Sequence, residues 1–106
     1  MFTYVAKVER VVDGDTIDVS IDLGFSIWHK VRLRLAGIDT PEVSTEFGKL
    51  VRDHVRSALE GQTVTITTTK TDKYGRYLAE VFVNENSFNK VLVDIGMAVA
   101  YNGGQR

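Results

Sequence analysis

Hydrophobic and polar residues alternate along most of the chain with a period of two, the pattern of strands that bury one face. The alternation predicts strands at residues 4–12, 15–23, 27–35, 62–69 and 77–83. It is clear in the second strand, where Ile17, Val19, Ile21 and Leu23 share one face and Thr16, Asp18, Ser20 and Asp22 share the other. Gly14 and Gly24 supply turn positions between the first three strands.

The period changes after Pro41, where hydrophobic residues recur at helical spacing. The spacing predicts a helix at residues 45–60, closed by Gly61. The hydrophobic series is Phe47, Leu50, Val51, Val55, Ala58 and Leu59.

A second helix is expected after Asn86 or Ser87, either of which can cap it, and it should end at Gly96. Its expected inner positions are Phe88, Val91, Leu92 and Ile95. Residues 97–101 can add a short extended segment. Three strands, a helix, two strands and a final helix form a mainly β chain with helices (α+β). That order predicts an OB-type five-stranded barrel with one helix between strands three and four and another after strand five.

Length and composition indicate one ordinary globular domain, residues 1–106. Hydrophobic residues make up 43% of the chain and charged residues 25%, and the absence of cysteine excludes disulfides and thiolate metal sites. No apolar run approaches the ~20 residues of a membrane helix. The N-terminus lacks the basic and apolar regions of a signal peptide, so we expect a cytoplasmic protein, although a leader could have been trimmed.

The net charge of −1 lacks the basic excess of a nucleic-acid-binding protein. The distribution is more informative, because no acid occurs between Gly24 and Gly37, where Lys30, Arg32 and Arg34 recur at every second residue. Taken alone, such a cluster is usually a solvated strand face.

Acids and glycines concentrate in two segments, Val-Asp-Gly-Asp-Thr at 12–16 and Arg-Leu-Ala-Gly-Ile-Asp-Thr-Pro-Glu at 34–42. Carboxylates suit a hard divalent cation and arginines suit a phosphate. A site that holds both is a candidate for metal-assisted cleavage of a phosphodiester. Separately, the first segment also fits a simple hairpin turn and the second a helix entry, so the combination carries the inference.

These segments, followed by Thr-Asp-Lys-Tyr-Gly-Arg-Tyr-Leu-Ala and Leu-Val-Asp-Ile-Gly-Met-Ala, resemble the staphylococcal (micrococcal, thermonuclease) nuclease family in order and rough spacing. The resemblance spans nearly the whole chain and favours the short, unsecreted bacterial or phage type. It implies an OB-type barrel, in agreement with the strand pattern. The short loop after Glu42 and the near-neutral charge depart from the secreted members and leave substrate affinity open.

The resemblance implies a calcium site. Asp15 and Asp39 match the carboxylate ligands, and Thr40 matches the residue whose backbone carbonyl is a third ligand. Asp13 matches an acid behind these ligands. Glu42 matches the glutamate assigned as general base, acting directly or by orienting the attacking water.

The resemblance also implies phosphate and nucleotide contacts. Arg34 and Arg76 match the arginines that grip the scissile phosphate, and Lys73 and Tyr74 match residues that contact a neighbouring phosphate. Tyr101 matches a tyrosine that lines the nucleotide site.

The implied activity is a calcium-dependent, sugar-nonspecific endonuclease that acts on DNA and RNA, preferably single-stranded, and leaves 3′-phosphate and 5′-hydroxyl ends. We expect a monomer without a membrane partner. The alternatives are a nuclease-like OB module that binds nucleic acid without cleaving it, and a general OB scaffold for oligonucleotide or protein partners. The acids and arginines all persist in this chain, which favours the enzyme.

Overall fold

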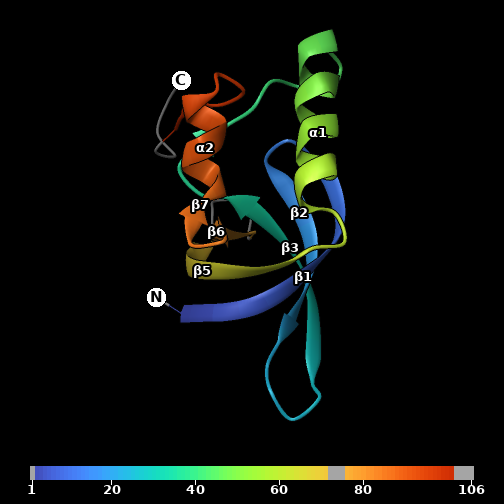
Figure 1. Cartoon of the computed structure of the whole chain (residues 1–106), viewed down its shortest axis with the longest axis vertical. Coiled ribbons are helices and arrows are strands. Elements are labelled where there is room, and N and C mark those ends of the chain that lie inside the picture. Colours follow the sequence, from blue (N-terminus) through green and yellow to red (C-terminus); the bar gives the residue numbers. More distant parts are fainter. Residues whose placement is uncertain (1, 72–75, 102–106) are drawn as a thin grey trace.

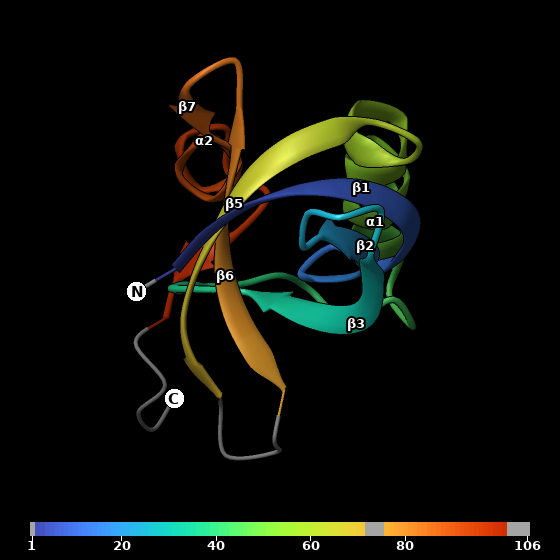
Figure 2. The same ribbon diagram turned by 90° about the horizontal axis from the view of Figure 1, so that it is seen from below.

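The computed structural model describes residues 2–71 and 76–101, and within these ranges five strands close into a barrel. The strands are β1 (Phe2–Asp13), β2 (Thr16–Asp22), β3 (Trp28–Leu35), β5 (Thr63–Thr71) and β6 (Tyr77–Val83). They are hydrogen-bonded in the order β3-β2-β1-β5-β6, and a parallel pairing of β3 with β6 closes the ring. Figure 2 shows these two strands near each other. The OB-type barrel is therefore confirmed.

Two helices occur in the described residues, α1 (Glu46–Leu59) and α2 (Phe88–Asp94). Helix α1 packs against β1 and α2 packs against β6 (Figure 1). Each begins at a hydroxyl cap: Thr45 Oγ1 accepts from the N–H of Gly48, and Ser87 Oγ accepts from the N–H of Lys90. Neither helix has the length and hydrophobicity that a membrane crossing needs, within the part of the chain that the structure describes.

Three two-residue strands complete the sheets within the described residues. β7 (Asn86–Ser87) extends β6, while β4 (Ile38–Asp39) pairs with β8 (Val99–Ala100) in a separate ribbon. The extended segment expected at 97–101 is thus confirmed at Val99–Ala100. This ribbon brings the end of the described chain back to the segment that follows β3.

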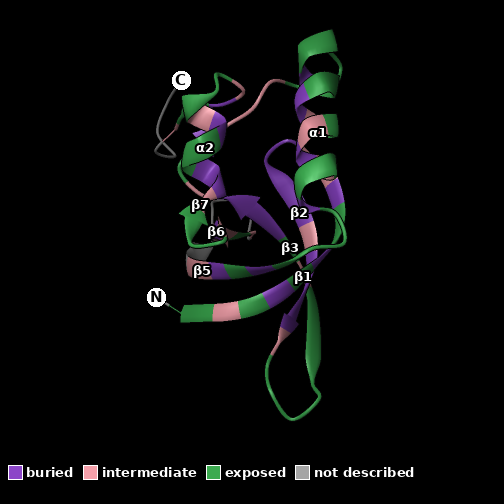
Figure 3. Ribbon diagram, in the orientation of Figure 1, coloured by how far each residue is buried: buried purple, intermediate pink, exposed green. Residues whose placement is uncertain are grey.

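Buried hydrophobic residues from the barrel strands and from both helices form a single core cluster, seen in purple in Figure 3. Asn89 is buried among them at 3% exposure. Its Nδ2 donates to the carbonyls of Ala36 (2.9 Å) and Ala79 (3.1 Å), and its Oδ1 accepts from the N–H of Val81 (3.0 Å). These bonds tie α2 to the seam where β3 meets β6.

Both predicted helices form, but fewer of their hydrophobic residues are buried than the helical spacing suggested. In α1 the buried residues are Gly48, Val51, Val55 and Leu59, whereas Phe47, Leu50 and Ala58 are exposed. The reason is that Gly48 packs directly against the chain at Glu42, which turns Phe47 and Leu50 outward. In α2 the expected inner positions Val91 and Ile95 are wrong, since both are exposed.

The second strand ends at Asp22, one residue earlier than predicted, and Leu23 is exposed. The β2–β3 hairpin projects beyond the barrel at this point (Figure 1). Residues at its tip therefore have no core to pack against.

Candidate active site

Arg34 lies on β3 at the point where its outward-facing side chain meets two short segments, the β1–β2 turn and β4. It is only 9% exposed. Nη1 donates to the carbonyl of Ile38 at 3.1 Å, and Nη2 lies 3.1 Å from Asp39 Oδ1 and 3.5 Å from Asp15 Oδ2. The guanidinium thus draws together two carboxylates from different parts of the chain.

The turn before β2 is built to bring Asp15 against Thr40. Asp13 Oδ1 accepts from the N–H of Asp15 (3.1 Å), and Asp15 Oδ2 accepts from the N–H of Thr40 (3.1 Å). Gly14 permits this approach, because a Cβ there would lie 2.8 Å from both Thr40 Oγ1 and Val51 Cγ1. The hydroxyl of Thr16 donates to Asp15 Oδ1 (3.3 Å). Both carboxylate oxygens of Asp15 are therefore engaged.

The two aspartates of the turn differ in acidity. Burial raises the pKa of Asp13 to about 6, and the hydrogen bond with Asp15 and its negative charge act in the same direction. Burial also opposes ionisation of Asp15, but the hydrogen bonds from Asp13 and Thr40 and the charge of Arg34 outweigh it and lower its pKa. Asp15 is consequently an anion at neutral pH, as a metal ligand must be.

Glu42 is exposed and lies in the loop between β4 and α1. Its backbone carbonyl accepts from the N–H (3.0 Å) and the hydroxyl (2.7 Å) of Thr45. A Cβ on Gly48 would lie 1.7 Å from the same carbonyl oxygen, so the first turn of α1 lies directly against the loop. The backbone is thus fixed, while the carboxylate forms no hydrogen bond or ion pair within the described residues.

Tyr101 lies over the guanidinium, with Arg34 Cζ 5.4 Å from the centre of its ring. The β4–β8 ribbon and a hydrogen bond from the N–H of Tyr101 to the carbonyl of Gly37 (2.8 Å) hold it there. A cation over an aromatic face is attracted by the ring's quadrupole.

The structure therefore brings together most of the residues proposed from the sequence: Asp13, Asp15, Arg34, Asp39, Thr40 and Tyr101. Arg76 is half-buried just before β6, whose Leu78 pairs with Arg34 across the barrel seam. Lys73 and Tyr74 lie outside the described residues.

Sequence reasoning missed the part that Thr45 and Gly48 play in fixing the backbone of Glu42. The available signal was Thr45 as a helix cap, three residues before the glycine whose N–H donates to it.

The available donors fit a hard cation. Asp15 and Asp39 offer carboxylates that converge on a single nitrogen of Arg34, and Thr40 adds a carbonyl next to Asp39. No group of three or more acids, histidines or cysteines is close enough to hold a metal within residues 2–71 and 76–101. Water would have to complete the shell, which the loose, oxygen-rich coordination of calcium allows.

Comparison with known proteins adds an independent observation. A family model described as staphylococcal nuclease homologue matches residues 32–106. The chain belongs to the staphylococcal nuclease family. The match includes Arg34, Asp39, Glu42 and Arg76, while the turn that holds Asp15 lies before it.

Curated relatives of this staphylococcal nuclease homologue agree. An uncharacterized endonuclease of Escherichia coli O157:H7 is 38% identical over 96 residues, which cover 90% of this chain and 60% of the relative. A micrococcal nuclease of Shigella flexneri is 35% identical over 104 residues (90% and 57%), and a thermonuclease of Staphylococcus hyicus is 37% identical over 102 (89% and 57%). The chain spans about 60% of the length of these relatives.

Proposed function

We propose that this chain is a calcium-dependent nuclease that hydrolyses phosphodiester bonds of DNA and RNA, with a preference for single strands. The observation that carries the proposal is the convergence of Asp15 and Asp39 on the guanidinium of Arg34 in a staphylococcal nuclease homologue. The resemblance of the motifs extends the proposal to products with 3′-phosphate and 5′-hydroxyl ends.

In this proposal Asp15, Asp39 and the carbonyl of Thr40 hold calcium. Bound calcium would polarise a phosphoryl oxygen and reduce the charge that an incoming nucleophile meets. The lowered pKa of Asp15 supports the assignment, because it keeps one ligand ionised without help from the metal.

Arg34 and Arg76 grip the scissile phosphate. A guanidinium presents five N–H donors in a planar fork, which matches two phosphate oxygens better than a lysine does. The contacts of Arg34 within the described residues use Nη1 and Nη2, so Nε keeps a donor for a phosphate oxygen. Donors fixed before the reaction stabilise charge best where it develops, on the five-coordinate phosphorus.

Glu42 acts on the attacking water. Its exposed carboxylate takes a proton as the water oxygen bonds to phosphorus, or orients that water. The bond from phosphorus to the 5′ oxygen then breaks, and that oxygen leaves as a hydroxyl after taking a proton from solvent. The phosphate stays on the 3′ side. Tyr101 lines the nucleotide site, and Lys73 and Tyr74 contact a neighbouring phosphate.

Digestion of single-stranded DNA in calcium, in magnesium and in EDTA tests the function. We expect cleavage in calcium, much slower cleavage in magnesium and none in EDTA, because magnesium demands a tighter octahedral shell than one carboxylate on a turn and one on a two-residue strand supply. Asp39→Asn should lose calcium binding, whereas Asp94→Asn, an exposed acid on α2, should behave as wild type. DNA binding without cleavage under all three conditions would favour the non-catalytic module instead.

A further inference from the structure

Positive side chains form two rows across the outer face of β1, β2 and β3. The pairing register places Lys7 opposite Ser20 and Ser20 opposite Lys30. In the next row, Arg10 lies opposite Asp18, which lies opposite Arg32. We call the four positive residues of these rows, Lys7, Arg10, Lys30 and Arg32, the cation face.

A β-bulge puts Arg10 on this face. Strict alternation from Lys7 outward and Val8 inward would turn Arg10 toward the core. The register shifts between Val8 and Arg10, so Glu9 and Arg10 are both exposed while Val11 is again buried. Bulges re-aim side chains in this way, often beside functional sites. The bulge thus adds one positive charge to the outer face.

The acids on the face do not neutralise it. Asp18 forms hydrogen bonds with Nε (2.8 Å) and Nη2 (3.2 Å) of Arg32, and Glu9 accepts from the hydroxyl of Ser20 (2.8 Å). Lys7, Arg10 and Lys30 form no salt bridge within the described residues. The face therefore carries a positive excess on a chain whose net charge is −1.

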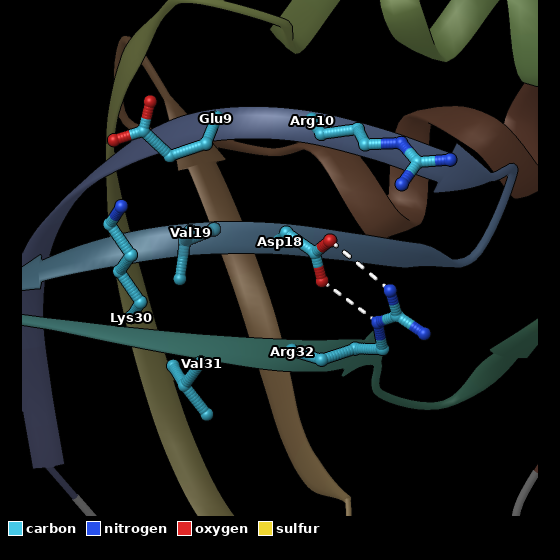
Figure 4. A pocket seen from close by; sticks show the side chains of 7 residues that line it. All are labelled: Glu9, Arg10, Asp18, Val19, Lys30, Val31 and Arg32. Carbon is cyan, nitrogen blue, oxygen red and sulfur yellow. Dashed lines mark hydrogen bonds and ion pairs between the residues drawn. The ribbon is translucent and has the colours of Figure 1, made fainter.

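An open groove of about 410 Å³ lies on this face and is lined by three of the four cations, Arg10, Lys30 and Arg32. Figure 4 shows its charged side chains, with Arg10, Asp18 and Arg32 at one end and Glu9 and Lys30 at the other. Val19 and Val31, which pack into the core, complete its lining. An open groove with charged walls suits an extended chain better than a small, enclosed ligand.

The cation face continues directly from the candidate active site. Lys30, Arg32 and Arg34 follow one another on the same side of β3, at intervals of about 6.6 Å for every two residues of a strand. Beyond Lys30 the same side of the strand carries Trp28, which is 54% exposed near the hairpin tip. The strand therefore lines up a phosphate-binding candidate, two further cations and an exposed aromatic ring.

We propose that the cation face binds the backbone of a single-stranded polynucleotide beyond the nucleotides at the cleavage site, with Trp28 stacking on a base. Cations that follow the backbone and aromatic rings that stack on bases are the two elements of sequence-independent single-strand binding. The inference rests on the proposed function, because it extends the phosphate contact of Arg34 along the same strand.

Binding in EDTA tests the face without cleavage. We would measure the affinity of a fluorescently labelled oligodeoxythymidylate at several salt concentrations for wild type, Arg10→Ala and Lys30→Ala. Neither variant removes an ion pair, so the barrel should stay intact. The slope of log affinity against log salt should become shallower by about 0.7 for each cation removed, since each single-strand phosphate contact contributes about that much. Lys90→Ala, an exposed cation on α2, should keep the wild-type slope.

Trp28 gives a second readout, as it is the chain's only tryptophan. Its fluorescence should be quenched over the same concentration range as binding of the labelled strand. In calcium, the face variants should raise the KM for long strands and leave hydrolysis of a dinucleotide unchanged.

Two results would overturn the inference without affecting the proposed nuclease function. One is an unchanged salt dependence of affinity in Arg10→Ala and Lys30→Ala, and the other is an equal loss of hydrolysis for the dinucleotide and the long strand. If the variants showed shallower salt slopes but the wild-type protein never cleaved DNA, the proposed function would be overturned and the binding role of the cation face would be supported.

Discussion

Arg34 Nη2 lies 3.1 Å from Asp39 Oδ1, an ion pair between side chains that are 11% and 15% exposed. The same nitrogen reaches Asp15 Oδ2 at 3.5 Å. The arginine thus offsets the repulsion between two carboxylates that the proposed calcium would also have to bind. Because its side chain is buried, Arg34 has a structural part as well as a chemical one.

Replacing this arginine should therefore destabilise the fold. Arg34→Ala removes the guanidinium that faces two nearly buried carboxylates, a change that typically costs about 3–5 kcal/mol. Thermal unfolding in EDTA should show a clear fall in Tm, and calcium should raise Tm more in the variant than in wild type, because no guanidinium then competes for the carboxylate oxygens. Arg52→Ala, which removes a more exposed pair with Asp53 on α1, is the control and should change little. Equal Tm gains in calcium would argue against shared carboxylates.

Arginine-to-lysine substitutions test how much the two-point contact of a guanidinium with phosphate contributes to turnover. Arg34→Lys and Arg76→Lys keep a positive charge but lose two-point binding of phosphate oxygens. Each should lower turnover by roughly 30- to 1,000-fold, or about 2–4 kcal/mol of transition-state stabilisation. Turnover at saturating calcium and DNA checks this. Normal turnover of either lysine variant would remove that arginine from phosphate recognition.

Gly48 gives a test of how the loop holds Glu42. In Gly48→Ala the new Cβ would lie 1.7 Å from the Glu42 carbonyl oxygen, so the loop must move. We expect turnover to fall while calcium-dependent binding of a nucleoside diphosphate persists, because both carboxylate ligands, Asp15 and Asp39, lie outside the loop and only the Thr40 carbonyl lies within it. Ser57→Ala, on the exposed side of the same helix, controls for helix propensity. If Gly48→Ala matched its control in turnover, the position of the loop would be irrelevant to catalysis.

The sequence predicted the barrel because its strands each bury one face, and period two records this directly. It could not predict that Gly48 would be the contact point of α1, because glycine does not register as hydrophobic and the contact depends on a loop folded against it. The burial of Arg34 was equally hidden. Parity places it on the outer side of β3, but the cover comes from Tyr101, which the β4–β8 ribbon brings back from a distant part of the chain.

For the proposed site, too, the sequence identified the residues but not the tertiary contacts between them. Motif order identified Asp15, Asp39 and Thr40, yet the bond from Thr40 to Asp15 joins residues 25 apart and emerges only when the β1–β2 turn closes on α1. Gly14 marks that closure, and its role is visible only when its neighbours are known.

The pH dependence of stability offers a check on Asp18. Its hydrogen bond with Arg32, aided by the charges of Arg32 and Arg10, holds the pKa of this carboxyl below its usual range. A depressed pKa in the folded state adds stability that is present above the unfolded value, about 3.9, and is lost as the pH falls through the folded value. In Asp18→Asn, the free energy of unfolding measured in urea should depend less on pH between roughly pH 5 and pH 3 than it does in wild type. Asp94→Asn should keep the wild-type profile.

Turnover of Glu42→Gln on single-stranded DNA at saturating calcium tests the central claim most directly. The substitution keeps the size of the side chain and its hydrogen bonding but removes its basicity, and a positioned base typically contributes about 10²- to 10⁴-fold. We expect a loss of turnover in that range, with residual products that still carry 3′-phosphates. Turnover equal to that of wild type would contradict the account by removing Glu42 from the reaction.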